Sequence, residues 1–356
     1  MIYLVCSASA WSNWGLGPRA GGRHSLRATA ARASHAPIIG LAILLTLNFA
    51  GCRPPSDGNR IRITGSDTMV NLSQSWAEAY CAEHAEVSPQ IRGGGSGVGL
   101  AALCNGKVEI ATSSRKMKPK ELELAKKNTG KEPKEFIVGR DALAIYIHKD
   151  NPLAMISIPD LAEIYGENGK ITRWEQVGDL NAPHATGEIV RISRQNNSGT
   201  FAYFGEAVLG KGREYKQGAI AQSGSADVVS LVSKTPSAIG YSGMGYFEVG
   251  QVKMIPVSKK KGEPGIEPTL ATTLDGTYPI SRPLYIYTLG EPTGPLAEFI
   301  QWVLGPQGQK IVEARGYVPN AIPAEKAAAA AVKAPDVKAS EVAPSTTESS
   351  TPAVAP

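Results

Sequence analysis

The sequence predicts an α/β fold with mixed, mostly parallel sheets, built as two lobes whose helix N-termini face one cleft. Short apolar strands lead repeatedly into helical patterns, which is typical of parallel α/β sheets. Three of these strand-to-helix junctions carry hydroxyl residues or glycine where the helix begins. Ligands of open α/β sheets bind beyond the carboxyl ends of the strands, so we expect these junctions to meet at one site.

The first junction follows a short β-branched strand, residues 61–64. The turn 65–68 contains Ser66, Asp67 and Thr68, and apolar residues at helical spacing follow it. Either Asp67 or Thr68 would make a suitable helix N-cap. This segment is therefore a strand, a polar turn and a helix.

The second junction follows strand 87–91, where Pro89 indicates an edge position. The glycine-rich turn 92–97 includes Ser96 and Gly97, and a short helix follows at 98–103. The turn lacks the Gly-Lys-Ser/Thr of a Walker loop, and the acidic residue of a dinucleotide fingerprint is missing. A nucleotide site of either kind is therefore not indicated.

Strand 108–111 ends in a run of hydroxyl residues that includes Ser114, followed by Arg115. Their side chains would project beyond the carboxyl end of the strand, where ligands bind. The alternative is a solvated loop with an exposed arginine.

The loop 194–200 joins strand 189–193 to the helical pattern 200–209. The first amides of a helix have no internal partner and attract anions. Arg194 adds a planar guanidinium, Gly199 allows close backbone approach, and Ser198 and Thr200 supply hydroxyls. Serine and threonine cap helices widely, so this loop alone is a weak indication, and the anion site rests on several loops together.

The other predicted elements complete the alternation of strands and helices. Residue 225 is predicted to cap the helix 226–233, and residues 259–265 form a charged linker. The predicted helices are 118–127, 158–165, 295–304 and 308–314, and the predicted strands are 141–148, 238–241, 254–257 and 282–288.

The ends of the chain differ in composition from its middle. Residues 1–51 carry arginines followed by an apolar run, 38–47, that is too short to span a bilayer and is typical of a signal peptide. Cys52 follows small residues as in a bacterial lipobox, although Phe49 is atypical there. Residues 52–59 are predicted to be a tether, and 322–356 a disordered tail rich in Ala, Pro, Ser and Thr.

Charge and residue counts exclude some classes of function. The 356 residues carry a net charge of +5 without a basic block interleaved with aromatics, so nucleic acid is not expected as a partner. The five histidines form no cluster with metal-ligand spacing, and we expect neither a metal nor a cofactor. Cys81 and Cys104 either pair in an oxidising compartment or are two small core residues.

From about residue 60 to residue 319 the chain resembles the phosphate-binding components of ABC transporters, the PstS-like branch of the type II periplasmic binding proteins. Any one matching motif would be weak, but all of them in this order and spacing are specific. The matching segments are residues 65–68, 94–99, 110–115, 161–165, 169–174, 194–200 and 238–241.

The resemblance implies two lobes, joined by crossing strands, that close on a dehydrated oxyanion. The first lobe would comprise residues 60–140 and 266–321, and the second 141–265. Inorganic phosphate would be captured at the periplasm or cell surface by a lipid-anchored monomer and delivered to an ABC permease and ATPase complex. The implied ligand contacts are Thr68, Ser96, Arg194, Ser198, Gly199 and Thr200, with Ser66, Asp67, Gly97, Ser114, Arg115 and Asp141 as further candidates in the same region.

One position departs from the family. Well-studied members carry an aspartate where this chain has Arg115, and that aspartate accepts the proton of the bound phosphate. Asp67 and Asp141 are the candidate replacements. Their alternatives are a helix N-cap for Asp67 and an ion pair with a neighbouring arginine for Asp141. Arg115 would then contact the anion or neutralise one of these carboxylates.

Two other functions compete with transport. A phosphatase would need a nucleophile with a base, or a metal. His84, His148 and His184 all lie outside the anion loops, so we expect no enzymatic activity. A phosphate sensor or adhesion protein could use the same two lobes, with the tail as an interaction arm.

Overall fold

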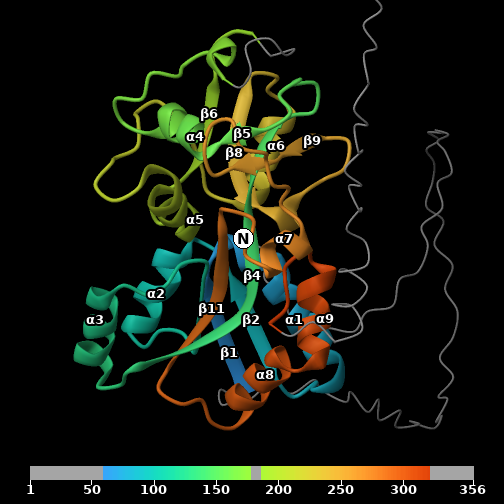
Figure 1. Ribbon diagram of the computed structural model, residues 1–356. Coiled ribbons are helices and arrows are strands. Elements are labelled where there is room, and N and C mark those ends of the chain that lie inside the picture. Colours follow the sequence, from blue (N-terminus) through green and yellow to red (C-terminus); the bar gives the residue numbers. More distant parts are fainter. Residues whose placement is uncertain (1–58, 178–185, 321–356) are drawn as a thin grey trace, which may run out of the picture.

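Two antiparallel strands, β4 (Pro133–His148) and β11 (Ser281–Leu289), run through the middle of the molecule and join its two lobes (Figure 1). The computed structural model describes residues 59–177 and 186–320. The predicted leader, the lipidation site Cys52, most of the tether and the predicted tail from residue 322 lie outside these ranges. None of the described helices is long and apolar enough to cross a membrane.

The first lobe, in the lower half of Figure 1, is built on three parallel strands. These are β1 (Arg60–Gly65), β2 (Ser88–Arg92) and β3 (Ile110–Ser113), and β2 is the edge strand that Pro89 predicts. In the core, one face of α1 packs with residues of β1, β11 and α8. It includes Trp76, whose indole donates to the carbonyl of Gly308 at 2.9 Å. The helices are α1 (Val70–Glu83), α2 (Ser96–Cys104), α3 (Pro119–Thr129), α8 (Pro295–Leu304) and α9 (Pro306–Ala314), with a 3-10 turn, η2 (Asp67–Met69), before α1.

The second lobe packs around stacked aromatic rings. The rings of Phe204 and Tyr241 lie 3.9 Å apart, and Tyr165 packs edge-on against both. Its strands are β5 (Ile156–Ser157), β6 (Val190–Arg194), β7 (Ile220–Gln222), β8 (Ala238–Gly243), β9 (Val252–Ile255) and β10 (Val257–Ser258). Its helices are α4 (Ile158–Tyr165), α5 (Gly199–Phe204) continuing as the π-helix η4 (Gly205–Leu209), α6 (Ser225–Ser233) and α7 (Leu270–Leu274), with the 3-10 turns η3 (Trp174–Gln176) and η5 (Met244–Tyr246).

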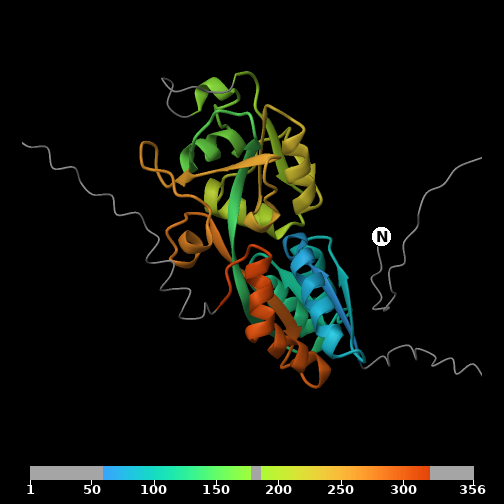
Figure 2. The ribbon, with the colours of Figure 1, turned by 90° about the vertical axis from the view of Figure 1, so that its right-hand side faces the viewer.

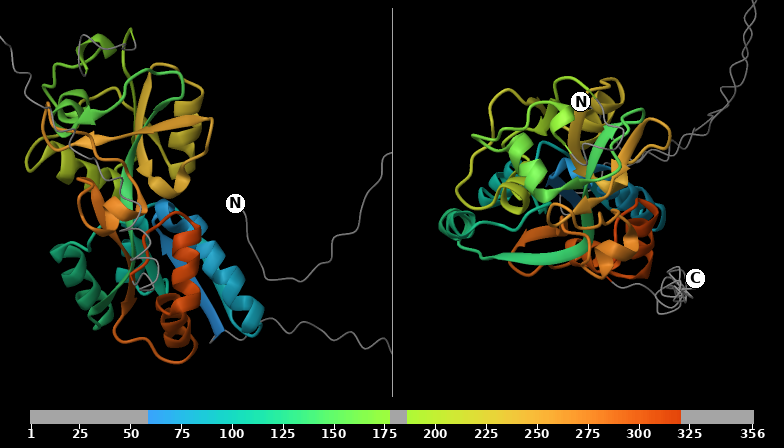
Figure 3. Two further views of the ribbon diagram at one scale, coloured as in Figure 1. Left: turned by 45° about the vertical axis from the view of Figure 1, so that its right-hand side comes forward. Right: turned by 45° about the horizontal axis from the view of Figure 1, so that its top comes forward.

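Strand order explains why the sheets are mixed. The main path runs β2-β1-β3-β11-β4-β8-β6-β7, with β9 also pairing with β4. Among the described strands, every antiparallel pair includes β4 or β11, and the remaining pairs are parallel. The α/β, mostly parallel fold joined by crossing strands is therefore confirmed. Figures 2 and 3 show the two lobes from other sides, with β4 passing between them.

Strand β4 is longer than the sequence predicts. It begins at Pro133 rather than at Asp141, because its first half pairs with β11 in the first lobe and is only partly buried. A continuous apolar pattern therefore appears only in its second half. The short elements β7 and α7 were not predicted; β7 is a three-residue edge strand with exposed side chains, which leaves little hydrophobic signal.

The lobe boundaries stay a proposal, and packing favours one adjustment to them. Tyr278 and Ile280 belong to the hydrophobic core of the second lobe, while Leu284 and Ile286 belong to that of the first. We therefore place the return of the chain to the first lobe at about Ser281 rather than at residue 266.

The structure contradicts a disulfide between Cys81 and Cys104. Both thiols are buried, and they are not bonded to each other. The Sγ of Cys81 donates to the carbonyl of Val87, and that of Cys104 to the carbonyl of Glu121. The second alternative, two small core residues, is the correct one.

Candidate anion-binding site

Three buried serines meet at the edge of the first lobe that faces the second. The Oγ of Ser66 donates to the Oγ of Ser114 at 3.0 Å, and the Oγ of Ser96 lies 3.4 Å from the same atom. Ser96 also accepts the backbone N–H of Ser114 at 3.1 Å. They come from the loops after β1 and β3 and from the start of α2, so the two predicted junctions of this lobe meet each other and the hydroxyl run after β3.

The loop before α5 brings the second lobe against these serines. Thr68 and Thr200 approach to 3.0 Å through their hydroxyls, and the backbone N–H of Gly97 donates to the carbonyl of Asn197 at 2.9 Å. A Cβ added to Gly199 would lie only 2.3 Å from the Oγ of Ser96 and 2.6 Å from that of Ser114. Glycine is therefore required for the lobes to come this close.

Ser198 has a different position from the other hydroxyl residues. Its Oγ caps α5, accepting the backbone N–H of Thr200 at 3.1 Å and that of Phe201 at 3.4 Å. The hydroxyl oxygen is thus used to order the loop that presents Gly199 and Thr200.

Arg194 lies at the end of β6, and only 1% of its surface is exposed. Its terminal nitrogens donate to the Oγ of Ser225 at 2.8 Å, to the carbonyl of Ser223 at 2.7 Å and to Oδ2 of Asp67 at 3.1 Å. Its buried Nε has no hydrogen-bond partner among the described residues. Burial lowers the pKa of the Arg194 guanidinium and Asp67 opposes that shift, but arginine stays charged.

Asp67 joins the two lobes rather than capping a helix. Its Oδ1 accepts the backbone N–H of Gly94 at 2.8 Å, and its Oδ2 binds Arg194 of the other lobe. The 3-10 turn η2 has no side-chain cap, so the N-cap alternative for Asp67 is wrong.

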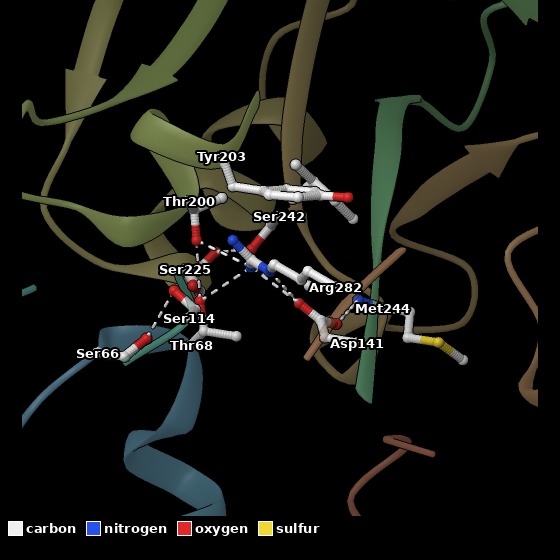
Figure 4. A network of polar contacts seen from close by, with 12 residues as sticks. Ser66, Thr68, Ser114, Asp141, Thr200, Tyr203, Ser225, Ser242, Met244 and Arg282 are labelled. Carbon is white, nitrogen blue, oxygen red and sulfur yellow. Dashed lines mark hydrogen bonds and ion pairs between the residues drawn. The ribbon is translucent and has the colours of Figure 1, made fainter. Parts of the chain in front are cut away.

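Asp141 and Arg282 face each other across the crossing strands β4 and β11. Their side chains are 0% and 1% exposed, and Oδ2 of Asp141 accepts from Nε and NH2 of Arg282 at 3.1 and 2.8 Å (Figure 4). Oδ1 accepts the backbone N–H of Met244 at 3.3 Å. Burial raises the pKa of Asp141, and the guanidinium of Arg282 offsets part of that rise.

The side chain of Arg115 turns away from this cluster. Its two terminal nitrogens bind the carboxylate of Glu121 at 2.9 and 2.7 Å, in the first turn of α3. The prediction that Arg115 neutralises Asp67 or Asp141 is wrong, because each of those carboxylates has another arginine. Its neighbour Ser114 is the residue that reaches the serine cluster.

Sequence reasoning missed Arg282, Ser225 as a partner of Arg194, and two tyrosines behind the first loop. Tyr246 donates to the carbonyl of Asp67, and Tyr317 donates to that of Thr68, both at 2.6 Å. Arg282 had one available signal, a lone cation in an otherwise apolar strand, since charged residues are seldom buried without a partner. In the described part of the chain, no group of three or more His, Cys, Asp or Glu could hold a metal ion.

Comparison with known proteins shows the family of this chain. The model of the PBP superfamily domain matches residues 53–307. The phosphate-binding protein PstS of Pseudomonas aeruginosa is 37% identical over 265 residues, which cover 72% of this chain and 81% of that protein.

Two solved structures are similar as well. One is a Clostridium perfringens protein with bound phosphate, described as a substrate-binding protein of a phosphate ABC transporter, with a TM-score of 0.65 and 30% identity; the match covers 74% of this chain and all of that one. The other is an ABC-type phosphate transport receptor from Vibrio cholerae, with a TM-score of 0.57, 26% identity and the same coverage. The chain belongs to the PBP superfamily, in its PstS-like family of two-lobed periplasmic binding proteins.

Proposed function

We propose that this protein captures inorganic phosphate between its lobes and delivers it to the permease and ATPase of an ABC transporter. One observation carries the proposal: Arg194 and Arg282 each bury an N–H group that has no acceptor among the described residues, and Arg282 also donates to a hydroxyl from each lobe. A buried donor without a partner costs free energy, and the oxygens of a tetrahedral anion would supply the missing acceptors.

This arrangement would bind the anion without catalysing a reaction. Hydroxyls, backbone amides and guanidinium groups are fixed by the fold, and a site closed off from water makes each hydrogen bond to the anion stronger. In the described part of the chain, side-chain and loop contacts join the two lobes beside the crossing strands, which suits a hinge motion for capture and release.

The names of the relatives support the assignment to phosphate transport and to a binding protein rather than an enzyme. We propose further that the protein works at the periplasm or cell surface as a monomer, anchored by a lipid on Cys52. The motif around Cys52 supports the anchor, since several acyl chains are enough for stable attachment.

Selectivity for phosphate over sulfate depends on an acceptor for the ligand's proton. Asp67 and Asp141 keep their proposed place beside the site, but each binds an arginine in this structure. The hydroxyl oxygens of Thr68 and Thr200 are further acceptors at the same position, because a hydroxyl both donates and accepts.

Isothermal titration calorimetry with inorganic phosphate tests the function. The wild-type protein should bind one phosphate per chain, and Arg194→Ala should weaken binding by roughly a hundredfold or more, since a charged hydrogen bond is lost and Asp67 is left unpaired. Arg62→Gln is the matched control, because Arg62 pairs with Glu109 on the exposed side of the first lobe. Absence of phosphate binding by the wild type, or wild-type affinity in Arg194→Ala, would reject the proposal.

A further inference from the structure

Arg282 is the least expected member of the site. It is the second residue of the crossing strand β11, directly opposite Asp141 of β4, and both side chains are almost fully buried. The ion pair uses one edge of the guanidinium, Nε and NH2, and a single carboxylate oxygen. An ion pair between the crossing strands would be a sufficient explanation if the contacts of Arg282 ended there.

The contacts of Arg282 extend into the anion loops. Its NH2 group also donates to the Oγ1 of Thr200 at 3.0 Å and to that of Thr68 at 3.4 Å, one hydroxyl from each lobe. Figure 4 shows the guanidinium between these hydroxyls on one side and Asp141 on the other, under the ring of Tyr203. The ring centre lies 5.6 Å from the guanidinium carbon, close enough for a cation–π contact.

The NH1 group of Arg282 is buried and has no partner among the described residues. Leaving a charged N–H without an acceptor is costly, and a residue needed only for the ion pair would not have to bear that cost. Arg194 shows the same pattern at its Nε, so the two guanidiniums each bind a carboxylate and keep one donor unused.

We propose that Arg282 is a second charged ligand of the bound oxyanion, donating through NH1, and that Asp141 is the positioning residue that holds its guanidinium in place. This rests on the proposed phosphate site. The anion would then be held by one arginine from the second lobe and one from the crossing strand β11, at the point where the chain returns to the first lobe. The expected ligand is a small tetrahedral oxyanion with at least two oxygens, so that each arginine can donate to one of them.

A double-mutant cycle with phosphate titration distinguishes two roles of Arg282: contact with the bound anion, or connection of β4 to β11 alone. Arg282→Gln should weaken phosphate binding roughly ten- to a hundredfold, as expected for one charged hydrogen bond. Asp141→Asn should weaken it less, because Arg282 keeps its charge and its contacts with Thr68 and Thr200. The double variant replaces the ion pair by two amides, and it should regain thermal stability while binding as weakly as Arg282→Gln alone.

Recovery of wild-type affinity in the double variant would overturn the proposal, since it would reduce Arg282 to a connector of β4 and β11. Wild-type affinity in Arg282→Gln would do the same. Both results leave phosphate binding by the wild type intact and so differ from a failure of the proposed function, in which the wild type itself does not bind. Arg62→Gln again controls for the loss of a surface cation.

A measurement on the unmutated side chain covers the case in which Arg282→Gln does not fold. In nitrogen-15 NMR of the arginine side chains, phosphate should shift the NH1 signal of Arg282, assigned with Arg282→Lys. A signal that stays unchanged while the protein saturates with phosphate contradicts the proposal.

Discussion

Two arginine–aspartate pairs flank the site, and they differ in what they connect. Arg194–Asp67 joins the two lobes, and the Asp67 side chain is 18% exposed. Arg282–Asp141 joins two neighbouring strands of one sheet and is closed to solvent. The first pair breaks if the lobes separate, whereas the second is kept by the β4–β11 ladder.

The two pairs are therefore expected to stabilise different things. The interlobe pair adds to the stability of the closed form, and we expect its contribution to be smaller than that of the crossing-strand pair because the carboxylate of Asp67 reaches water. The crossing-strand pair stabilises the fold itself, because removal of one partner would leave a charge buried without compensation.

The largest effect is expected at the crossing strands. Asp141→Ala leaves the guanidinium of Arg282 buried without its carboxylate, and should lower the free energy of unfolding by about 3–5 kcal/mol. Urea denaturation of the variant and the wild type measures this. A loss below about 1 kcal/mol, the range of a surface pair, would erase the distinction drawn between the two pairs.

The next largest effect is expected at Gly199, where the second lobe lies against Ser96 and Ser114 of the first. Gly199→Ala places a methyl group against the hydroxyls of Ser96 and Ser114, so the closed form is disfavoured and phosphate binding should weaken roughly ten- to a hundredfold. The thermal midpoint should stay near that of the wild type, because alanine is compatible with the first turn of α5. Unchanged affinity in calorimetry would mean that the ligand binds without this contact.

A smaller effect is expected at the interlobe pair. Asp67→Asn keeps an acceptor for the N–H of Gly94 but loses the charge facing Arg194, and should weaken phosphate binding about fivefold with little change in unfolding. Competition between phosphate and sulfate on the same variant tests its role as proton acceptor: a change in their ratio supports that role, and an equal loss for both anions contradicts it.

The smallest effect is expected at Arg115, outside both pairs. Arg115→Gln should bind phosphate as the wild type does. Burial raises the pKa of Glu121, but the hydrogen bonds and charge of Arg115 and the N–H of Lys118 outweigh it, so the net pKa is lowered. A carboxyl with a lowered folded-state pKa stabilises the fold above its unfolded pKa, about 4.3, and loses this contribution as the pH falls through the folded value.

The stability difference between wild type and Arg115→Gln should therefore be present at neutral pH and vanish in acid. Chemical denaturation at both pH values checks the sign. A difference that grows in acid would contradict the lowered pKa of Glu121. A drop in phosphate affinity would show that Arg115 contributes to the binding site.

Much of the fold and part of the site could be predicted from local sequence patterns. The hydroxyl and glycine loops at Ser66, Ser96 and Thr200 were predicted because each follows a short strand and opens a helix, which are signals within one segment. Arg282 was missed because its importance comes from register: it lies opposite Asp141 only after β11 pairs with β4. Arg115 was misplaced for a related reason, since successive residues after β3 point in different directions.

A crystal structure of the protein grown with inorganic phosphate tests the account most directly. We expect one phosphate between the lobes, within hydrogen-bond distance of Thr68, Ser96, Thr200 and the guanidinium groups of Arg194 and Arg282. Phosphate bound on either lobe alone, with Thr68 and Thr200 still paired to each other and no contact to Arg194, would contradict it.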